Sequence, residues 1–183
     1  MVRAVSTSST LRRIALLWLL MAAPSAWADW RAELPGAALV GQGDFTWFGW
    51  RVYQARLWSP AAPVSWEQPF ALELIYRREL SRDTLVQASL DEMRRLGGTS
   101  VEEARLAAWD DEMRKAFIDV QPGQRITGLY QPGKGGSFYV DDQFRHAVAD
   151  TDFARAFFAI WLDARTRNPE LRRELLGLNE TNP

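Results

Sequence analysis

The chain has 183 residues, with 22 basic and 23 acidic side chains, one histidine and no cysteine. The lack of cysteine excludes disulfides, thiolate nucleophiles and cysteine-ligated metals, and one histidine cannot build a two- or three-histidine metal site. The near balance of charge gives no electrostatic reason to bind nucleic acid.

The first 28 residues have the pattern of an export signal. Arg3, Arg12 and Arg13 precede an apolar run over 14–23, and Pro24–Ala28 ends in a small-x-small pattern. The run covers about 10 residues, whereas a helix needs roughly 20 to cross a bilayer. We therefore predict cleavage after Ala28 and a periplasmic protein, the alternative being a retained membrane anchor. Without the three arginines, 19 basic and 23 acidic groups remain, a net charge of −4.

The next part of the chain predicts strands. We expect a hairpin from residues 39–43 and 45–58, because aromatic and branched side chains are frequent there and glycines mark a bend. Residues 70–76 alternate large apolar side chains with others, which predicts a strand with one buried face.

Two helices should follow. Ser81 is a plausible N-cap for an apolar stripe that ends at Gly97-Gly98. Ser100 and Glu103 have the spacing of a capping box, which predicts a second helix that starts at Ser100 and continues to Phe117.

The last part of the domain predicts a second hairpin, from 125–130 and 137–140, and then more helix. Residues 153–161 carry an apolar stripe, and Asn168-Pro169 suits the start of a final helix that Gly177 closes. Strands, helices, strands and helices in this order predict an α+β fold with an antiparallel sheet backed by helices. We expect one domain over 29–178 and a frayed polar tail over 179–183.

Several motifs invite a chemical interpretation that the residues do not support. Residues 128–134 read G-x-x-x-x-G-K, but Gly135 replaces the required hydroxyl and the segment joins two strands, which favours a hairpin turn over a phosphate site. His146, which we place on a short helical segment, lacks partners for a catalytic triad. Asp141-Asp142 and the later aspartates favour turns and helix caps over a calcium site. We expect no metal and no cofactor.

A mixed group of cationic and phenolic side chains is the better candidate for a ligand site. It is interleaved with apolar residues of the early strands and consists of Arg51, Tyr53, Arg56, Tyr76, Arg77 and Arg78. A cleft with apolar walls and arginine or tyrosine donors suits an amphipathic carboxylate or phenol. The competing interpretation is that the arginines lie on solvated strand faces.

The chain resembles the chalcone isomerase-like superfamily, specifically a bacterial exported branch, over nearly all of its length after the signal. The strings that carry the resemblance are LVGQG (39–43), RVYQARL (51–57), FALEL (70–74), PGKGG (132–136), FFAIWLD (157–163) and LRRELLG (171–177). The resemblance implies an open-faced sandwich, in which a curved antiparallel sheet has helices packed on one face and a ligand cleft lies between them.

The resemblance does not extend to a catalytic set. Plant members of the superfamily close a flavanone ring with an arginine, a threonine, a lysine, a tyrosine and an asparagine, and related members bind fatty acids without catalysis. Here the stretch Gly36–Gly43 has no arginine, Phe48 lies at the threonine position with Thr46 two residues away, and 100–117 contains neither tyrosine nor asparagine. We therefore assign no catalytic residue.

Three hypotheses remain. The first is a non-catalytic binding protein for a small amphipathic molecule, such as a fatty acid or an aromatic acid. The second is an isomerase or intramolecular lyase with a non-standard acid/base set, in which Tyr53 or Tyr76 has a pKa lowered by neighbouring arginines. The third is a periplasmic interaction module without a ligand. Neither the ligand nor the oligomeric state follows from the sequence.

Overall fold

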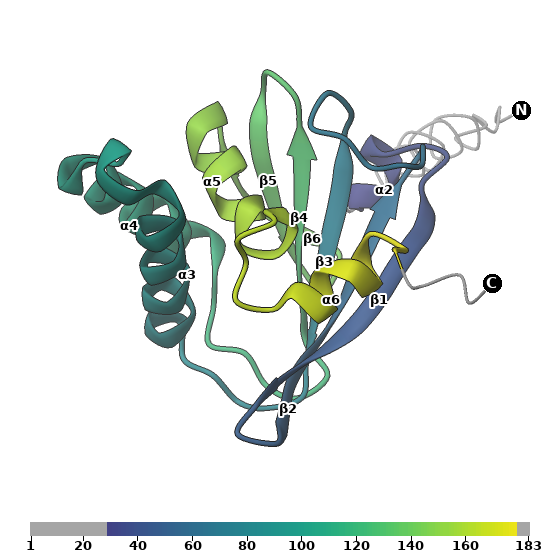
Figure 1. The fold of residues 1–183 in the computed structure, drawn as a ribbon, viewed down its shortest axis with the longest axis horizontal. Helices are drawn as coiled ribbons and strands as arrows, with labels where there is room; N and C mark the ends of the chain where they lie inside the picture. Colours follow the sequence, from purple (N-terminus) through teal and green to yellow (C-terminus); the bar gives the residue numbers. More distant parts are fainter. Residues whose placement is uncertain (1–28, 179–183) are drawn as a thin grey trace, which may run out of the picture.

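The computed structural model describes residues 29–178, which form one antiparallel sheet with helices packed against it (Figure 1). The six strands lie in the order of the sequence, each paired with the next. Their bounds are β1 Ala38–Trp47, β2 Trp50–Ser59, β3 Phe70–Tyr76, β4 Arg125–Gln131, β5 Gly135–Val140 and β6 Gln143–Val148. The helices are α2 Trp30–Glu33, α3 Arg82–Gly97, α4 Glu103–Ala116, α5 Thr151–Leu162 and α6 Pro169–Leu175, with a 3₁₀ turn, η2, at Gly98–Ser100. This confirms the predicted α+β open-faced sandwich. The predicted signal and polar tail lie outside the described residues.

The first strand of the first hairpin, β1, is longer than we predicted. β1 continues through Asp44 to Trp47, and the turn is made by Phe48 and Gly49, not by residue 44. The glycine at 41 is required by packing, because a Cβ there would lie 2.0 Å from the carbonyl oxygen of Glu174. It lets α6 lie directly against β1, and a bulge between Leu39 and Gly41 adjusts the register.

Of the two helices between β3 and β4, α3 begins where we predicted and α4 does not. The Ser81 hydroxyl accepts a hydrogen bond from the backbone N–H of Thr84, as expected of an N-cap. The prediction of a capping box at Ser100 is wrong. Ser100 lies in η2, where its hydroxyl donates to the Gly97 carbonyl. Helix α4 starts only after Glu102. The serine therefore binds the C-terminal end of α3 and does not cap the N-terminus of α4.

The last three strands form a continuous meander. The 131–136 loop is a tight hairpin turn, as predicted. Asp141 and Asp142 take left-handed φ values of 48° and 67° in the next turn. His146 is not helical as we expected. It lies on β6 opposite Phe138, and its Nε2 is 2.6 Å from a Glu112 oxygen of α4.

Helices α3 to α6 cover one face of the sheet, and the main core lies between the two layers. Side chains from β2, β3, β4 and β5 meet α5, whose buried face includes Phe153, Phe157 and Phe158. Asp150 caps α5 by accepting from the N–H groups of Asp152 and Phe153, which confirms its predicted capping role.

The opposite face of the sheet is covered in part by the short α2. Trp30 and Leu34 are buried there against Leu129 and Tyr139, which alternate along their strands with the residues of the main core. The Trp30 indole N–H donates to a carboxylate oxygen of Asp142 at 3.3 Å, and the Tyr139 hydroxyl donates to Glu33 at 2.6 Å. The N-terminal end of the described chain is therefore attached to the last strands of the sheet.

Candidate functional site

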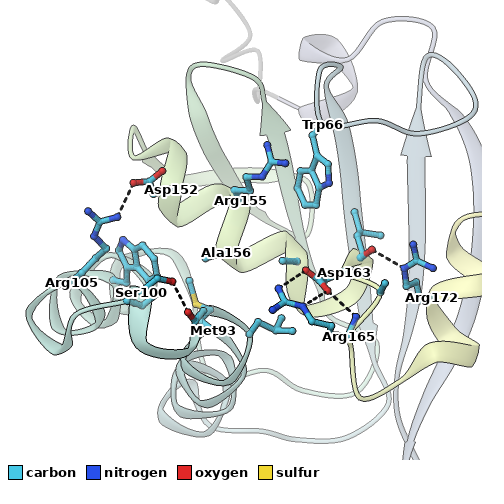
Figure 2. A pocket seen from close by; sticks show the side chains of 17 residues that line it. Trp66, Met93, Ser100, Arg105, Asp152, Arg155, Ala156, Asp163, Arg165 and Arg172 are labelled. Carbon is cyan, nitrogen blue, oxygen red and sulfur yellow. Dashed lines mark hydrogen bonds and ion pairs between the residues drawn. The ribbon is translucent and has the colours of Figure 1, made fainter.

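A hollow of about 630 Å³ opens in the helical layer, bordered by α3, α4, α5 and the loop after α5 (Figure 2). Trp66, from the loop between β2 and β3, closes one side of it. The resemblance implied a cleft between sheet and helices, and this hollow lies among the helices instead. The space above the sheet is filled by buried rings, among them Phe70, Phe138 and Phe158.

The walls of the hollow combine an apolar part with charged side chains at its opening. Met93 and Leu96 come from the end of α3, Trp109 from α4, and Ala156 and Ala159 from the exposed side of α5. The two alanines leave open space because a larger side chain at either position would project into the hollow. A volume of this size falls within the range of about 300–1,000 Å³ that is typical of small-molecule sites.

One hydrogen bond holds α4 in position beside α5. The Trp109 indole N–H donates to Asp150 at 2.9 Å, and the same carboxylate caps α5. Burial alone would raise the pKa of Asp150, but these three hydrogen bonds and the charge of Arg105 hold that pKa below its ordinary value. A charged cap therefore joins two helices that border the hollow.

Arginines surround the opening, and most of them have a partner. Arg105 pairs with Asp152 at 2.7 Å, and Arg165 pairs with Asp163 at 3.0 Å. Arg172 donates from Nε to the Leu162 carbonyl at 2.8 Å. The hydrogen bond and the charge of Arg165 lower the pKa of Asp163, although burial opposes them. These pairs lie at opposite ends of the opening in Figure 2.

Arg155 differs from the other arginines at this site. Its guanidinium lies 5.0 Å from the ring centroid of Trp66, and within residues 29–178 it has no carboxylate partner. A guanidinium that stacks on an aromatic ring keeps its edge N–H groups available to an acceptor. The hollow thus combines an apolar part of its wall with Arg155, a cation that can receive a carboxylate.

The residues predicted from the sequence do not come together in one place, and none of them lines this hollow. Tyr53 and Tyr76 face the helices and are packed edge to face, with ring centroids 5.9 Å apart. The Tyr53 hydroxyl accepts a hydrogen bond from the Trp161 indole at 3.0 Å. Burial raises the pKa of both phenols, with the Trp161 hydrogen bond opposing it at Tyr53. The isomerase hypothesis predicted that neighbouring arginines lower the pKa of Tyr53 or Tyr76. That prediction is wrong, because burial raises both pKa values and no arginine charge counteracts it.

Three of the predicted arginines lie near the far end of the first hairpin. Arg51 is exposed and lies 3.6 Å from Asp44. Arg78 stacks on the Trp50 ring at 4.5 Å, and Arg77 follows the end of β3, where its backbone N–H donates to Val52. All three are exposed. Their assignment to a ligand site stays a prediction.

Arg56 points to the opposite face of the sheet. There it joins Arg31 and Arg125 around Glu73, with nitrogen–oxygen distances of 3.7, 3.8 and 3.9 Å respectively. The Glu73 side chain is 1% exposed, and neither of its oxygens makes a hydrogen bond to the described residues. Strand alternation separates this charged cluster from Tyr53 and Tyr76.

The sequence analysis missed the residues that form the hollow. Trp66, Trp109 and Arg155 lie on three elements that are far apart in the chain, and each has an ordinary local pattern. Within residues 29–178 there is no group of three potential metal ligands. No helix in the same range is both long enough and apolar enough to span a membrane.

Comparisons with known proteins point to one family. The chain matches the family described as chalcone isomerase-like over residues 46–177. The fold is similar to that of a fatty-acid binding protein of Arabidopsis thaliana, with a TM-score of 0.59 and 13% sequence identity over 77% of this chain and 87% of the other. A search of the curated proteins found no match.

Proposed function

We propose that this chain, which belongs to the chalcone isomerase-like family, is a non-catalytic binding protein for a small amphipathic carboxylate such as a fatty acid. The observation that carries the proposal is the hollow of about 630 Å³ beside Arg155. The similarity of fold to a fatty-acid binding protein agrees with it.

The ligand would lie with its apolar part against the alanines of α5 and the α3 side chains. Its carboxylate would receive hydrogen bonds from Arg155, whose charge the described residues leave without an acidic partner. Charge-assisted bonds of this kind are stronger than neutral ones and select carboxylates over alcohols. The raised pKa of both buried tyrosines agrees with a binding role, since neither phenol is poised to exchange protons near neutral pH.

Titration calorimetry with dodecanoic acid and dodecanol tests this assignment. The Arg155→Met variant should bind the acid about tenfold more weakly and the alcohol unchanged. Arg173→Met on α6 is the matched control, because Arg173 is exposed, does not line the hollow and makes only a 3.8 Å pair with Glu170. The Ala159→Trp variant should abolish binding of both compounds by filling the hollow.

Two results would contradict the proposal. One is wild-type protein that binds neither compound. The other is Ala159→Trp protein that is folded by circular dichroism and binds as the wild type does. A chalcone added to the protein should also isomerise no faster than in buffer, and a faster loss of its absorbance would revive the isomerase hypothesis.

We also propose that the protein acts in the periplasm, as a member of a bacterial exported branch of the family. The basic and apolar order of residues 1–28 supports this proposal. Expressed in a Gram-negative host, the protein should appear in the periplasmic fraction with Asp29 as its first residue. Leu17→Arg should retain it in the cytoplasm. Full-length wild-type protein in the cytoplasm would refute export.

A further inference from the structure

The turn between β1 and β2 exposes three large aromatic side chains. Trp47 is 60% exposed, Phe48 85% and Trp50 62%. We name these three residues the aromatic tip. Contiguous exposed rings of this size on a protein surface mark interaction sites more often than chance, because each loses favourable free energy by facing water.

The backbone of the aromatic tip is also costly. Phe48 has a φ of 48°, in the left-handed region that bulky residues rarely adopt, and Gly49 follows with a φ of 78°. Two such residues make the kind of turn that usually carries asparagine or glycine. The Phe48 ring contacts Trp47 edge to face at 5.0 Å and is otherwise directed to solvent. The strained position presents an aromatic ring outward, which favours a function over a structural role.

The hairpin extends beyond the rest of the sheet. The last register pair between β2 and β3 is Tyr53 with Tyr76, whereas β1 and β2 continue to pair as far as Trp47 and Trp50. Figure 1 shows this hairpin projecting at one end of the molecule. The aromatic tip is therefore the first part of the fold to meet a flat surface brought to that end.

Cations lie just behind the aromatic tip. Arg78 stacks on Trp50, and within the described residues neither Arg78 nor Arg77 has a carboxylate partner. Arg51 shares its charge with Asp44, and two exposed acids, Glu79 and Asp119, belong to the chain segments next to Arg78. Aromatic rings ahead of arginines reproduce the order found at membrane interfaces, where rings lie at headgroup level and cations meet phosphates.

We propose that the aromatic tip docks the protein on the surface of a phospholipid bilayer that carries net negative charge. The rings would enter the headgroup region while Arg77 and Arg78 contact lipid phosphates. A membrane fits better than a protein partner, since a stable protein interface uses roughly 20–30 residues per side and the aromatic tip consists of three. The proposal is independent of the ligand assigned to the hollow.

Vesicle co-sedimentation of the full domain tests this inference. With vesicles of equal parts phosphatidylcholine and phosphatidylglycerol, Phe48→Ser should weaken partitioning about tenfold. Arg77→Gln with Arg78→Gln should remove most of the preference for these vesicles over pure phosphatidylcholine, roughly fivefold for each arginine. Phe144→Ser is the matched control, because Phe144 is a 48% exposed aromatic residue on β6. All variants alter exposed side chains, and circular dichroism verifies their folding.

The following outcomes would overturn the proposal. Wild-type protein could remain in the supernatant with both kinds of vesicle, or Phe48→Ser could sediment as the wild type does. An equal loss in Phe144→Ser would mean that binding is not a property of the aromatic tip. A wild-type dimer that Phe48→Ser converts to a monomer in light scattering would assign the tip to a second copy of the chain.

Discussion

The hydroxyl of Tyr53 is expected to stabilise the fold, whereas that of Tyr76 is not. Replacing Tyr53 with Phe removes the acceptor of the 3.0 Å bond from Trp161, whose side chain is only 8% exposed. A buried N–H left without a partner costs about 1–3 kcal/mol. The Tyr76 hydroxyl makes no hydrogen bond to the described residues, so Tyr76→Phe should change stability by less than about 0.5 kcal/mol.

Urea unfolding of the two variants measures this difference directly. We expect Tyr53→Phe to lose about 2 kcal/mol of unfolding free energy with an unchanged denaturant slope. The same loss should lower the melting temperature by roughly 4–8 °C in a domain of this size. Because the two rings are neighbours and the same atom is removed from each, the comparison isolates the hydrogen bond from the general effect of losing a hydroxyl.

Two results would refute this reasoning. Equal losses in the two variants would mean that the Trp161 bond contributes nothing specific. A Tyr53→Phe variant of normal stability that binds dodecanoic acid more weakly would make Tyr53 a ligand-binding residue, as the sequence analysis predicted. In that case the site would lie at the sheet, and the hollow beside Arg155 would not be the main site.

Three further predictions concern pH and packing. Burial raises the pKa of Tyr53 and Tyr76, so their contribution to stability is complete below the unfolded-state pKa of about 10 and is lost as pH rises above it. Replacing both with Phe should therefore flatten the alkaline part of the profile of unfolding free energy against pH. The pKa of Asp150 is lowered, so its contribution is present above about pH 4 and is lost as pH falls. Asp150→Ala should cost about 2 kcal/mol at neutral pH and make the acid limb of that profile shallower, because the cap and the partner of Trp109 disappear together. Gly41→Ala should cost about 1–3 kcal/mol in thermal unfolding, because its Cβ would collide with the Glu174 carbonyl; an unchanged melting temperature would contradict the close packing of α6 on β1.

Local sequence patterns predicted correctly those elements in which the pattern of apolar residues follows from burial alone. Residues 70–76 form β3 as expected, with one face against the helices, but Ala71 and Glu73 on the other face are buried as well. The first hairpin was misplaced because Gly41 and Gly43 resemble a bend, whereas they are strand residues kept small by the approach of α6. β6 was missed because it is an edge strand with mostly exposed side chains and no periodic pattern around His146.

The candidate site was harder to predict than the fold. Hydrophobic stripes correctly placed Trp109 and Phe157 on buried helix faces, but they contain no information about where two helices fail to fill the space between them. The hollow depends on the angle between α3, α4 and α5 and on the small size of Ala156 and Ala159. The predicted arginine and tyrosine group was separated by strand alternation, which sends Arg56 to the face opposite Tyr53.

The attachment of α2 to the far end of the sheet has a consequence for the order of folding. Trp30 bonds to Asp142, a residue 112 positions later in the chain. Its docking surface exists only once β4 and β5 have paired. The first described helix must therefore be among the last to settle. Protection of the Trp30 indole N–H from solvent exchange would report the completion of the whole sheet.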